Sequence, residues 1–216
     1  MAPVTVVACV YGDRGYQSFV PRWFKAIGNL ENPPAQVIIG ADRFTYEAST
    51  EVVSENLHWT YPQAYYLQDA ITNASTEWIW ICDIDDLAMP NALNGIEDVT
   101  EDVWQMGYLR HPDELLYIPP QLSPGEVLAS EKNPFVAGSA FRRDAFEEVG
   151  GFPDVALQDW ALWRRMAHHG MRFKSSGRAH FHYNRHLATR GHTELTLARR
   201  QQHIAEMMES EARVTH

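Results

Sequence analysis

The chain of 216 residues is poor in cysteine and contains no long apolar run. Its two cysteines, Cys9 and Cys82, each lie within a segment that we expect to be a buried strand, so we interpret both as small apolar core residues in a reducing compartment. No stretch reaches the roughly twenty apolar residues of a membrane span, and Met1–Tyr11 has neither a basic start nor a signal-type cleavage site. A soluble, cytoplasmic protein is therefore expected.

Basic residues are also few: the chain has 18 Lys and Arg and 28 Asp and Glu, which gives a net charge of −10. Phosphate backbones are bound by clustered Lys and Arg, so we expect no stable nucleic-acid binding. A nucleic acid that serves only as a transient acceptor remains compatible with this charge. The chain has no internal repeat or low-complexity tract, and its hydrophobic content of 45% favours one globular domain with a sizeable core.

The most informative segment is Trp78–Asp86, an uninterrupted apolar run that leads directly into Asp83, Asp85 and Asp86. A run rich in β-branched and aromatic side chains is typical of a strand that is buried on both faces, as in a sheet covered by helices. Small molecules bind at the carboxyl ends of such strands. Because carboxylates favour hard cations, the cluster predicts a site for Mg²⁺ or Mn²⁺ and a phosphorylated substrate.

Other interpretations of this cluster remain open. An acidic turn on the surface is about as common, because Asp hydrogen-bonds its own backbone and begins helices well. A calcium loop is excluded, since Leu87 and Ala88 occupy positions where an EF-hand needs a ligand and a glycine. A haloacid-dehalogenase-type phosphatase would use Asp83 as the nucleophile and Asp85 as the acid. Leu87 departs from that motif, and no later predicted strand ends in paired acids.

The first third of the chain predicts a βαβ unit. Val4–Val10 is an apolar strand, a helix ends near Gly28, and Gln36–Ile39 is a second strand that leads to Asp42. Such a unit begins many nucleotide-binding sheets. Asp42 could equally be the N-cap of a helix predicted for Thr45–Asn56.

The remaining pattern continues the alternation of strands and helices and ends in an amphipathic helix. The predicted fold class is α/β, with a mostly parallel central sheet flanked by helices. We expect one domain over residues 1–192, and residues 193–216 as a C-terminal helix packed on that domain or on a partner subunit in a homo-oligomer. The later predicted elements are a helix at Tyr61–Ala74, a strand at Phe135–Phe141, a helix at Gln158–His169 and a mobile flap at Pro119–Asn133.

A set of short motifs follows the βαβ unit in a fixed order. They are Ala74–Asp86 with Pro90, Gly138, Phe141–Arg143, Gly150–Phe152, Gln158–Trp160, Arg165, Gly170 and Tyr183–His186. In this order, the segments from about Val4 to His186 resemble GT-A (Rossmann-like) glycosyltransferases of family 2. Two positions depart from the family pattern: Leu67–Ala70 lacks the usual Arg-Asn, and Gln158 replaces the usual Glu before Asp159.

The resemblance implies a metal site. Asp85 would be a direct ligand of Mn²⁺ or Mg²⁺, Asp83 would contact the ribose and, directly or through water, the metal, and His186 would be a third ligand. His182 and His180 compete for that last role. Imidazole suits Mn²⁺ better than Mg²⁺, while a solvated or hydrogen-bonded side chain is an equally good interpretation of any one histidine.

The resemblance also implies the remaining site residues. Asp159 would be the general base that deprotonates an acceptor hydroxyl, with a helix N-cap as its competing role. The expected activity is transfer of a sugar from a nucleoside diphosphate sugar, UDP-linked by expectation, to an unidentified hydroxyl acceptor. A non-catalytic sugar-nucleotide binding module is the alternative. The residues implied to contact the donor are Val10, Tyr11, Gly12, Asp42, Asp83, Ile84 and Gly138.

Overall fold

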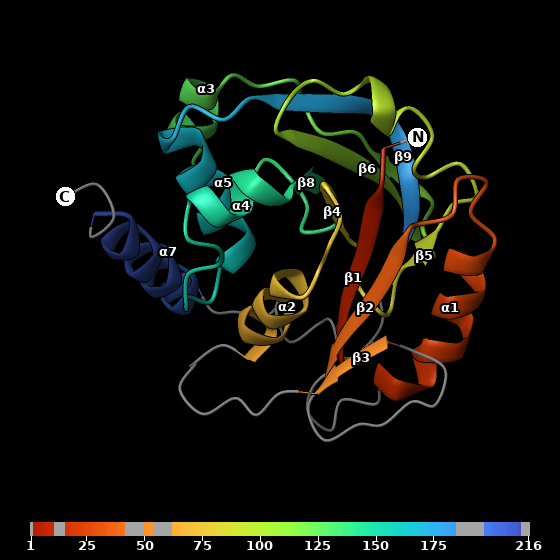
Figure 1. Cartoon of the computed structure of the whole chain (residues 1–216). Helices are drawn as coiled ribbons and strands as arrows, with labels where there is room; N and C mark the ends of the chain where they lie inside the picture. The colour runs from red at the N-terminus through yellow and green to blue at the C-terminus, as the bar shows by residue number, and fades with distance from the viewer. Residues whose placement is uncertain (1, 11–15, 42–49, 54–61, 185–196, 213–216) are drawn as a thin grey trace.

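A single mixed sheet lies at the centre of the molecule, with helices on both of its faces (Figure 1). The computed structural model describes residues 2–10, 16–41, 50–53, 62–184 and 197–212. The order across the sheet is β3-β2-β1-β4-β8-β6-β9-β5, and β7 pairs with β6. The strands are β1 (Val4–Val10), β2 (Gln36–Ala41), β3 (Thr50–Val53), β4 (Trp78–Ile81), β5 (Leu87–Ala88), β6 (Val103–His111), β7 (Leu115–Tyr117), β8 (Ala140–Arg142) and β9 (Phe173–Asn184).

The helices include most of those that the sequence periodicity predicts. They are α1 (Val20–Gly28), α2 (Pro62–Thr72), α3 (Pro124–Ala129), α4 (Arg143–Glu148), α5 (Gln158–His168) and α7 (Leu197–Ala212), with short 3-10 helices η1 (Tyr16–Phe19) and η2 (Ile96–Asp98). Gly150 and Gly151, which follow α4, both have positive φ (75° and 72°), the conformation that glycine adopts most easily at a helix end. No helix among the described residues is long and apolar enough to cross a membrane.

The predicted βαβ unit is present. β1 pairs in parallel with both β2 and β4, and β2 pairs in parallel with β3. The carboxyl ends of β1 and β4 therefore lie at the same edge of the sheet, where ligands of such sheets bind.

The prediction of a mostly parallel sheet is wrong. β8 runs antiparallel to β4 and β6, and the pairs β5–β9 and β6–β7 are also antiparallel, whereas β6 and β9 are parallel. Residues 112–114 alone connect β6 to β7. Parallel strands need a crossover of about a dozen residues or more. A connection of this length therefore makes β6 and β7 an antiparallel hairpin.

Two local predictions are also wrong. Thr50–Val53 is the parallel strand β3, not part of a helix over Thr45–Asn56, and the rest of that range lies outside the described residues. Pairing with β2 overrides the helical pattern there. The strand predicted for Phe135–Phe141 is much shorter, since only Ala140 and Phe141 of this range belong to β8. The residues just before β8 form a turn, in which Ser139 N–H donates to Ala137 O (2.8 Å).

β4 is buried on both faces, as predicted. Ile79 and Ile81 pack in one apolar cluster with α2, α4 and α5, and Trp78 and Trp80 pack in a second cluster with α1. All four side chains are at most 1% exposed. This central position fixes where the acidic turn that follows β4 must begin.

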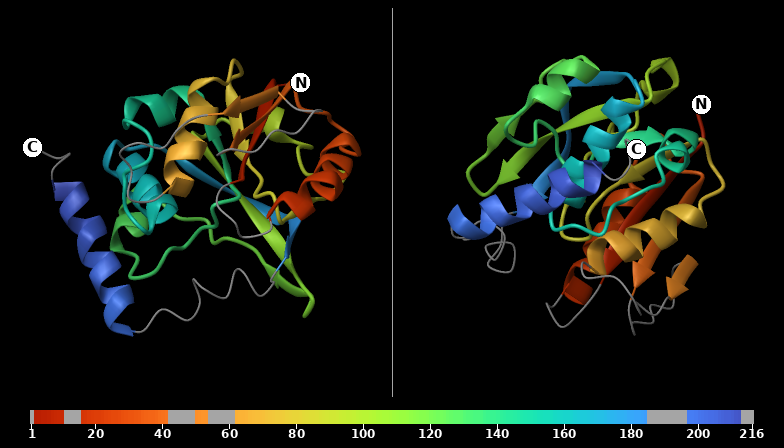
Figure 2. Two further views of the ribbon diagram at one scale, coloured as in Figure 1. Left: turned by 90° about the horizontal axis from the view of Figure 1, so that it is seen from below. Right: turned by 90° about the vertical axis from the view of Figure 1, so that its left-hand side faces the viewer.

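The C-terminal helix α7 packs against α5 of the same chain. Met207 of α7 contacts a cluster that includes Trp160 of α5, and Arg164 of α5 forms a buried ion pair with Glu211 of α7. Figure 2 shows α7 at the periphery beside α5, on the opposite side of the molecule from α1. α7 therefore stabilises the position of α5, the helix that carries Asp159.

Close contact between β2 and α2 yields a stability prediction. A Cβ atom on Gly40 would lie 2.2 Å from the backbone oxygen of Tyr66, which cannot move without α2. Gly40→Ala should therefore lower the free energy of unfolding by about 1–3 kcal/mol or more, as overpacking does, measured by urea denaturation. Gly28→Ala is the matched control, since nothing lies within 4 Å of its Cβ position, and it should change the free energy by less than about 0.5 kcal/mol. Equal effects of the two substitutions would contradict this packing.

Candidate functional site

The acidic turn after β4 is held in place by two other elements. Trp23 of α1 donates its indole N–H to Cys82 O (3.1 Å), and Arg22 donates to the backbone oxygen of Asp85 (3.0 Å). The backbone N–H of Asn184, at the end of β9, donates to Asp86 Oδ1 (2.9 Å). The turn is therefore anchored to both α1 and β9 before any ligand binds.

The carboxylates of this turn are packed closely enough to perturb one another. Burial, together with the charges of Asp85 and Asp159, raises the pKa of Asp83 to about 7. Burial and the charges of Asp85 and Asp83 raise the pKa of Asp86 well above its usual range, although the N–H of Asn184 and the charge of Arg22 oppose the shift. Because several buried like charges repel one another, a cation in this turn would be strongly stabilising.

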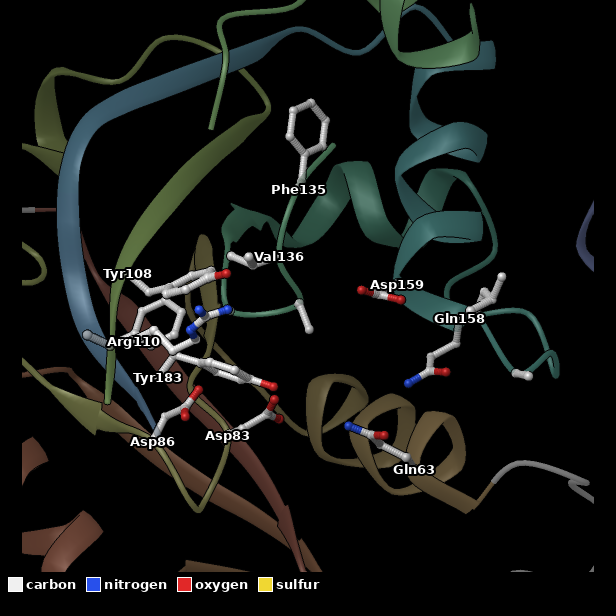
Figure 3. Close-up of a pocket in the computed structure, with 15 residues that line it drawn as sticks. Gln63, Asp83, Asp86, Tyr108, Arg110, Phe135, Val136, Gln158, Asp159 and Tyr183 are labelled. Carbon is white, nitrogen blue, oxygen red and sulfur yellow. The ribbon is translucent and has the colours of Figure 1, made fainter. Parts of the chain in front are cut away.

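A cavity of about 530 Å³ opens beside the turn (Figure 3). Asp83 and Asp86 lie at one side of it, and Asp159 of α5 lies across from them. The two sides interact electrostatically, since the charge of Asp159 raises the pKa of Asp83. The cavity is lined by Gln63, Asp83, Asp86, Tyr108, Arg110, Phe135, Val136, Ala137, Gly138, Ala156, Leu157, Gln158, Asp159, Phe181 and Tyr183.

Asp159 lies in the first turn of α5, where the helix dipole favours a negative charge. The N-cap of α5 is Leu157, so Asp159 does not fill the N-cap position itself. Its Oδ2 accepts a hydrogen bond from Asn133 Nδ2 (2.8 Å). Burial raises the pKa of Asp159, while backbone N–H groups and Asn133 oppose the rise, so this carboxylate takes up a proton more readily than an ordinary Asp.

The described residues include part of the metal site that the sequence implies. Asp85 is 7% exposed and is not among the residues that line the cavity, whereas Asp83 is. Within the described ranges, no three His, Cys, Asp or Glu side chains are arranged to hold a metal ion. The oxygen donors of Asp83 and Asp85 suit Mg²⁺ or Mn²⁺, but His186 lies outside the described residues.

The two histidines that compete with His186 have different surroundings. His182 is half-buried on β9, opposite Leu87 of β5. His180 is fully buried, stacks edge-on against Trp104 with ring centroids 4.7 Å apart, and its Nδ1 lies 2.6 Å from Ala92 O. A carbonyl only accepts, so Nδ1 carries the proton and donates. Burial then lowers the pKa of His180 to about 4, and His180 is a core residue.

The residues expected to contact the donor are only partly described. Val10 and Ile84 are 1% and 2% exposed, so they could meet a ligand through backbone atoms alone. Gly138 lines the cavity, where a Cβ atom would lie 2.7 Å from the ring of Phe181. The other three, Tyr11, Gly12 and Asp42, lie outside the described residues.

The sequence pattern did not identify several cavity residues. Asn133, the hydrogen-bond partner of Asp159, fell in the predicted flap and carried no motif. Tyr108 and Arg110 are two residues apart on β6, and side chains two apart in a strand lie on the same face. This spacing is the one signal in the sequence that could have placed them together.

Two comparisons of the chain gave no match: no protein-family model matches it, and no curated protein does. Solved structures do match. S. aureus TarS 1–349 in complex with UDP-GlcNAc has a TM-score of 0.67 and 13% identity, over 85% of this chain and 59% of TarS 1–349. The mannosyltransferase PcManGT from Pyrobaculum calidifontis, in complex with GDP-Man and Mn²⁺, has a TM-score of 0.63 and 20% identity, over 98% and 64% of the two chains.

These likenesses show the fold. The chain has the GT-A glycosyltransferase type of fold, as the sequence resemblance predicted, and it spans less than two thirds of either chain. At such identities, similarity of the backbone does not establish the donor, the metal or the acceptor.

The burial of His180 predicts a pH dependence of stability. Its pKa in the folded chain, about 4, lies below the ordinary value of 6.5, so the unfolded chain binds the proton more strongly. The stability that neutral His180 contributes is complete above pH 6.5 and is lost as the pH falls toward 4. By pH 5 this loss should reach about 2 kcal/mol.

His180→Asn tests this, because its amide can still donate to Ala92 O but does not titrate. Urea denaturation of both proteins between pH 7.5 and 5 should show that the variant, which loses the ring packing, is less stable at pH 7.5. The difference in the free energy of unfolding between the wild-type protein and the variant should become smaller by about 2 kcal/mol at pH 5. A difference that stays constant over this range would show that His180 titrates normally.

Proposed function

We propose that the chain is a metal-dependent glycosyltransferase that moves a sugar from a nucleoside diphosphate sugar, with UDP as the first nucleotide to test, to a hydroxyl acceptor. The observation that carries the proposal is the arrangement of Asp83 and Asp159 on opposite sides of one cavity in a GT-A-type fold. The matched structures support it, since TarS was solved with UDP-GlcNAc and PcManGT with GDP-Man and Mn²⁺.

In this proposal the acidic turn holds the diphosphate end of the donor. Asp85 would be the direct metal ligand, Asp83 would contact the ribose and the metal, and His186 would complete the set, with His182 as its competitor. A bound Mn²⁺ or Mg²⁺ would supply positive charge to the departing diphosphate. The repulsion among Asp83, Asp85 and Asp86 supports a cation in this turn.

In this proposal Asp159 acts on the acceptor. The acceptor oxygen attacks the anomeric carbon, the bond from that carbon to the diphosphate oxygen breaks, and its electron pair leaves with the nucleoside diphosphate. The hydroxyl proton passes to Asp159, which Asn133 orients through its hydrogen bond. This general base fits inversion at the anomeric carbon; in a retaining transfer, Asp159 would position the acceptor or the donor instead.

Two alternatives make different predictions. A non-catalytic binding module would bind a nucleoside diphosphate sugar without turning it over. A phosphatase would release phosphate without needing a nucleoside. The solved structures that share the fold and are described above are glycosyltransferases, which supports transfer over both alternatives.

The donor and metal sites can be tested together. In thermal-shift measurements against UDP- and GDP-sugars, the wild-type protein should be stabilised by one donor, and more so with Mn²⁺. Asp85→Asn should remove the dependence on Mn²⁺ and lower turnover more than about a hundredfold, because it removes a charged ligand. Exposed Asp98→Asn is the matched control. Undiminished metal-dependent turnover in Asp85→Asn would refute the metal assignment.

The role of Asp159 is tested by Asp159→Asn, which keeps the shape of the side chain but removes the base. The rate of sugar transfer should fall by about 10²–10⁴-fold, measured by release of nucleoside diphosphate in the presence of acceptor. Thermal shift with the donor separates loss of catalysis from loss of the donor site. A near-normal rate of transfer would remove Asp159 from the base role.

A further inference from the structure

One wall of the cavity has no part in the donor site described above. It consists of Tyr108 and Arg110 on β6 and of Tyr183 on β9, and we call it the tyrosine–arginine wall. Arg110 and Tyr183 are paired across the two strands, and Tyr108 lies two residues before Arg110 on the same face. In the view of Figure 3 this wall faces Asp159 across the cavity, with Asp83 and Asp86 below it.

The rings of the wall are held rigidly. Tyr108 stacks on Tyr117 of β7 with centroids 5.1 Å apart and an interplanar angle of 26°, and it contacts Tyr183 at 5.1 Å and Phe181 at 6.0 Å. The β6–β7 hairpin keeps Tyr108 and Tyr117 directly opposite each other. A rigid aromatic surface of this kind suits the flat face of a ring, and costs little entropy when the ring binds.

Arg110 is oriented by a carboxylate outside the cavity. Asp113, in the turn between β6 and β7, accepts hydrogen bonds from Arg110 Nε (2.9 Å) and from its Nη2. Among the described residues, none accepts a hydrogen bond from Arg110 Nη1. The Arg110 side chain is 26% exposed, so a molecule in the cavity can reach it. A guanidinium held in this way offers its remaining N–H groups to a planar anion.

Arg110 is the only Lys or Arg among the described residues that line the cavity. The contacts that lower the pKa of Asp86 come from the N–H of Asn184 and from Arg22, and no ion pair joins Arg110 to the acidic turn. Arg110 is paired with Asp113 on the side away from the cavity, so the part of its guanidinium that lines the cavity is what a bound molecule can reach. In the sheet, β8 and β4 separate β6 from β1 and β2, so Arg110 lies away from the strand ends that are proposed to contact the nucleotide.

We propose that the tyrosine–arginine wall is the acceptor subsite, and that the acceptor is a ring-bearing molecule with an anionic group, either a carboxylate or a phosphate. The ring lies against Tyr108, the anion binds Arg110, and the hydroxyl to be glycosylated faces Asp159. This inference rests on the proposed glycosyltransferase function and specifies its acceptor class.

The test compares probes that share a glucose framework and differ in the group at C6, which is neutral in one and anionic in the other two. Donor turnover by the full chain is measured with Mn²⁺ and increasing glucose, glucuronate or glucose 6-phosphate, because a probe in the subsite either accepts the sugar or blocks hydrolytic water. The apparent KM or Ki of each probe then reports its affinity. Glucuronate carries a carboxylate and glucose 6-phosphate carries a phosphate, so the two probes show which of these anionic groups the subsite binds.

In the wild-type protein, at least one charged probe should bind about tenfold or more tightly than glucose, as a charge-assisted hydrogen bond allows. Arg110→Gln should reduce this ratio to near one. Arg172→Gln is the matched control: the same substitution at an exposed arginine at the start of the β9 region, outside the cavity lining. It should leave the ratio as in the wild-type protein.

Three outcomes would overturn the inference while the proposed function stands: no preference for charged probes, a preference that survives in Arg110→Gln, or a raised donor KM in Arg110→Gln with the probe ratio unchanged. The last would assign Arg110 to the donor diphosphate. If the wild-type protein turns over no nucleoside diphosphate sugar, the proposed function itself fails, and the inference with it.

Discussion

Repulsion among buried carboxylates at the end of β4 is the constraint on which the rest of the site depends. β4 is buried between two apolar clusters, so the turn after it begins inside the molecule and its acids lose solvent. The raised pKa values of Asp83 and Asp86 express the energy of holding like charges together there. The fold maintains this arrangement through contacts from α1 and β9, so the site is preorganised for positive charge.

The change of strand direction in the sheet divides the site into two parts. β3, β2, β1 and β4 form the parallel part, which brings the ends of β1 and β4 to one edge. Beyond β4, the antiparallel β8 and the long strands β6 and β9 form the opposite wall. β9 contributes to both parts, since Asn184 binds Asp86 while Tyr183 lines the cavity. The carboxylates of the acidic turn and the aromatic side chains of the cavity therefore come from different parts of the sheet.

The position of Asp159 depends on distant contacts of α5. Arg164 binds Glu211 of α7 and donates to Leu128 O of α3 (2.6 Å), and Arg165 donates to Gly151 O (3.3 Å). Both arginines lie on the helix whose first turn carries Asp159. The ion pair is almost completely buried, so removing one partner would leave an uncompensated charge. α7, which contributes no residue to the cavity lining, thus helps to hold the helix that carries Asp159.

Local patterns in the sequence determined most of the elements. The apolar run of β4 and the periodicity of α5 each depend on residues close in the chain, and each element was predicted within one or two positions. The acidic turn was found from the apolar run that leads into it, and Asp159 was found because the order of motifs resembles a known family. That order also predicted the GT-A type of fold, which the solved structures confirm.

Tertiary structure alone decided the rest. The antiparallel direction of β8, the strand β3 in place of a helix, and the burial of His180 against Trp104 all depend on partners far away in the chain. The same is true of Asn133 on Asp159 and of Arg110 in the cavity. A local sequence pattern reports which face of an element is apolar, but not which neighbour covers it. The chemistry of the acidic turn could therefore be predicted from the sequence, whereas the wall opposite Asp159 emerged only when β6 and β9 were paired.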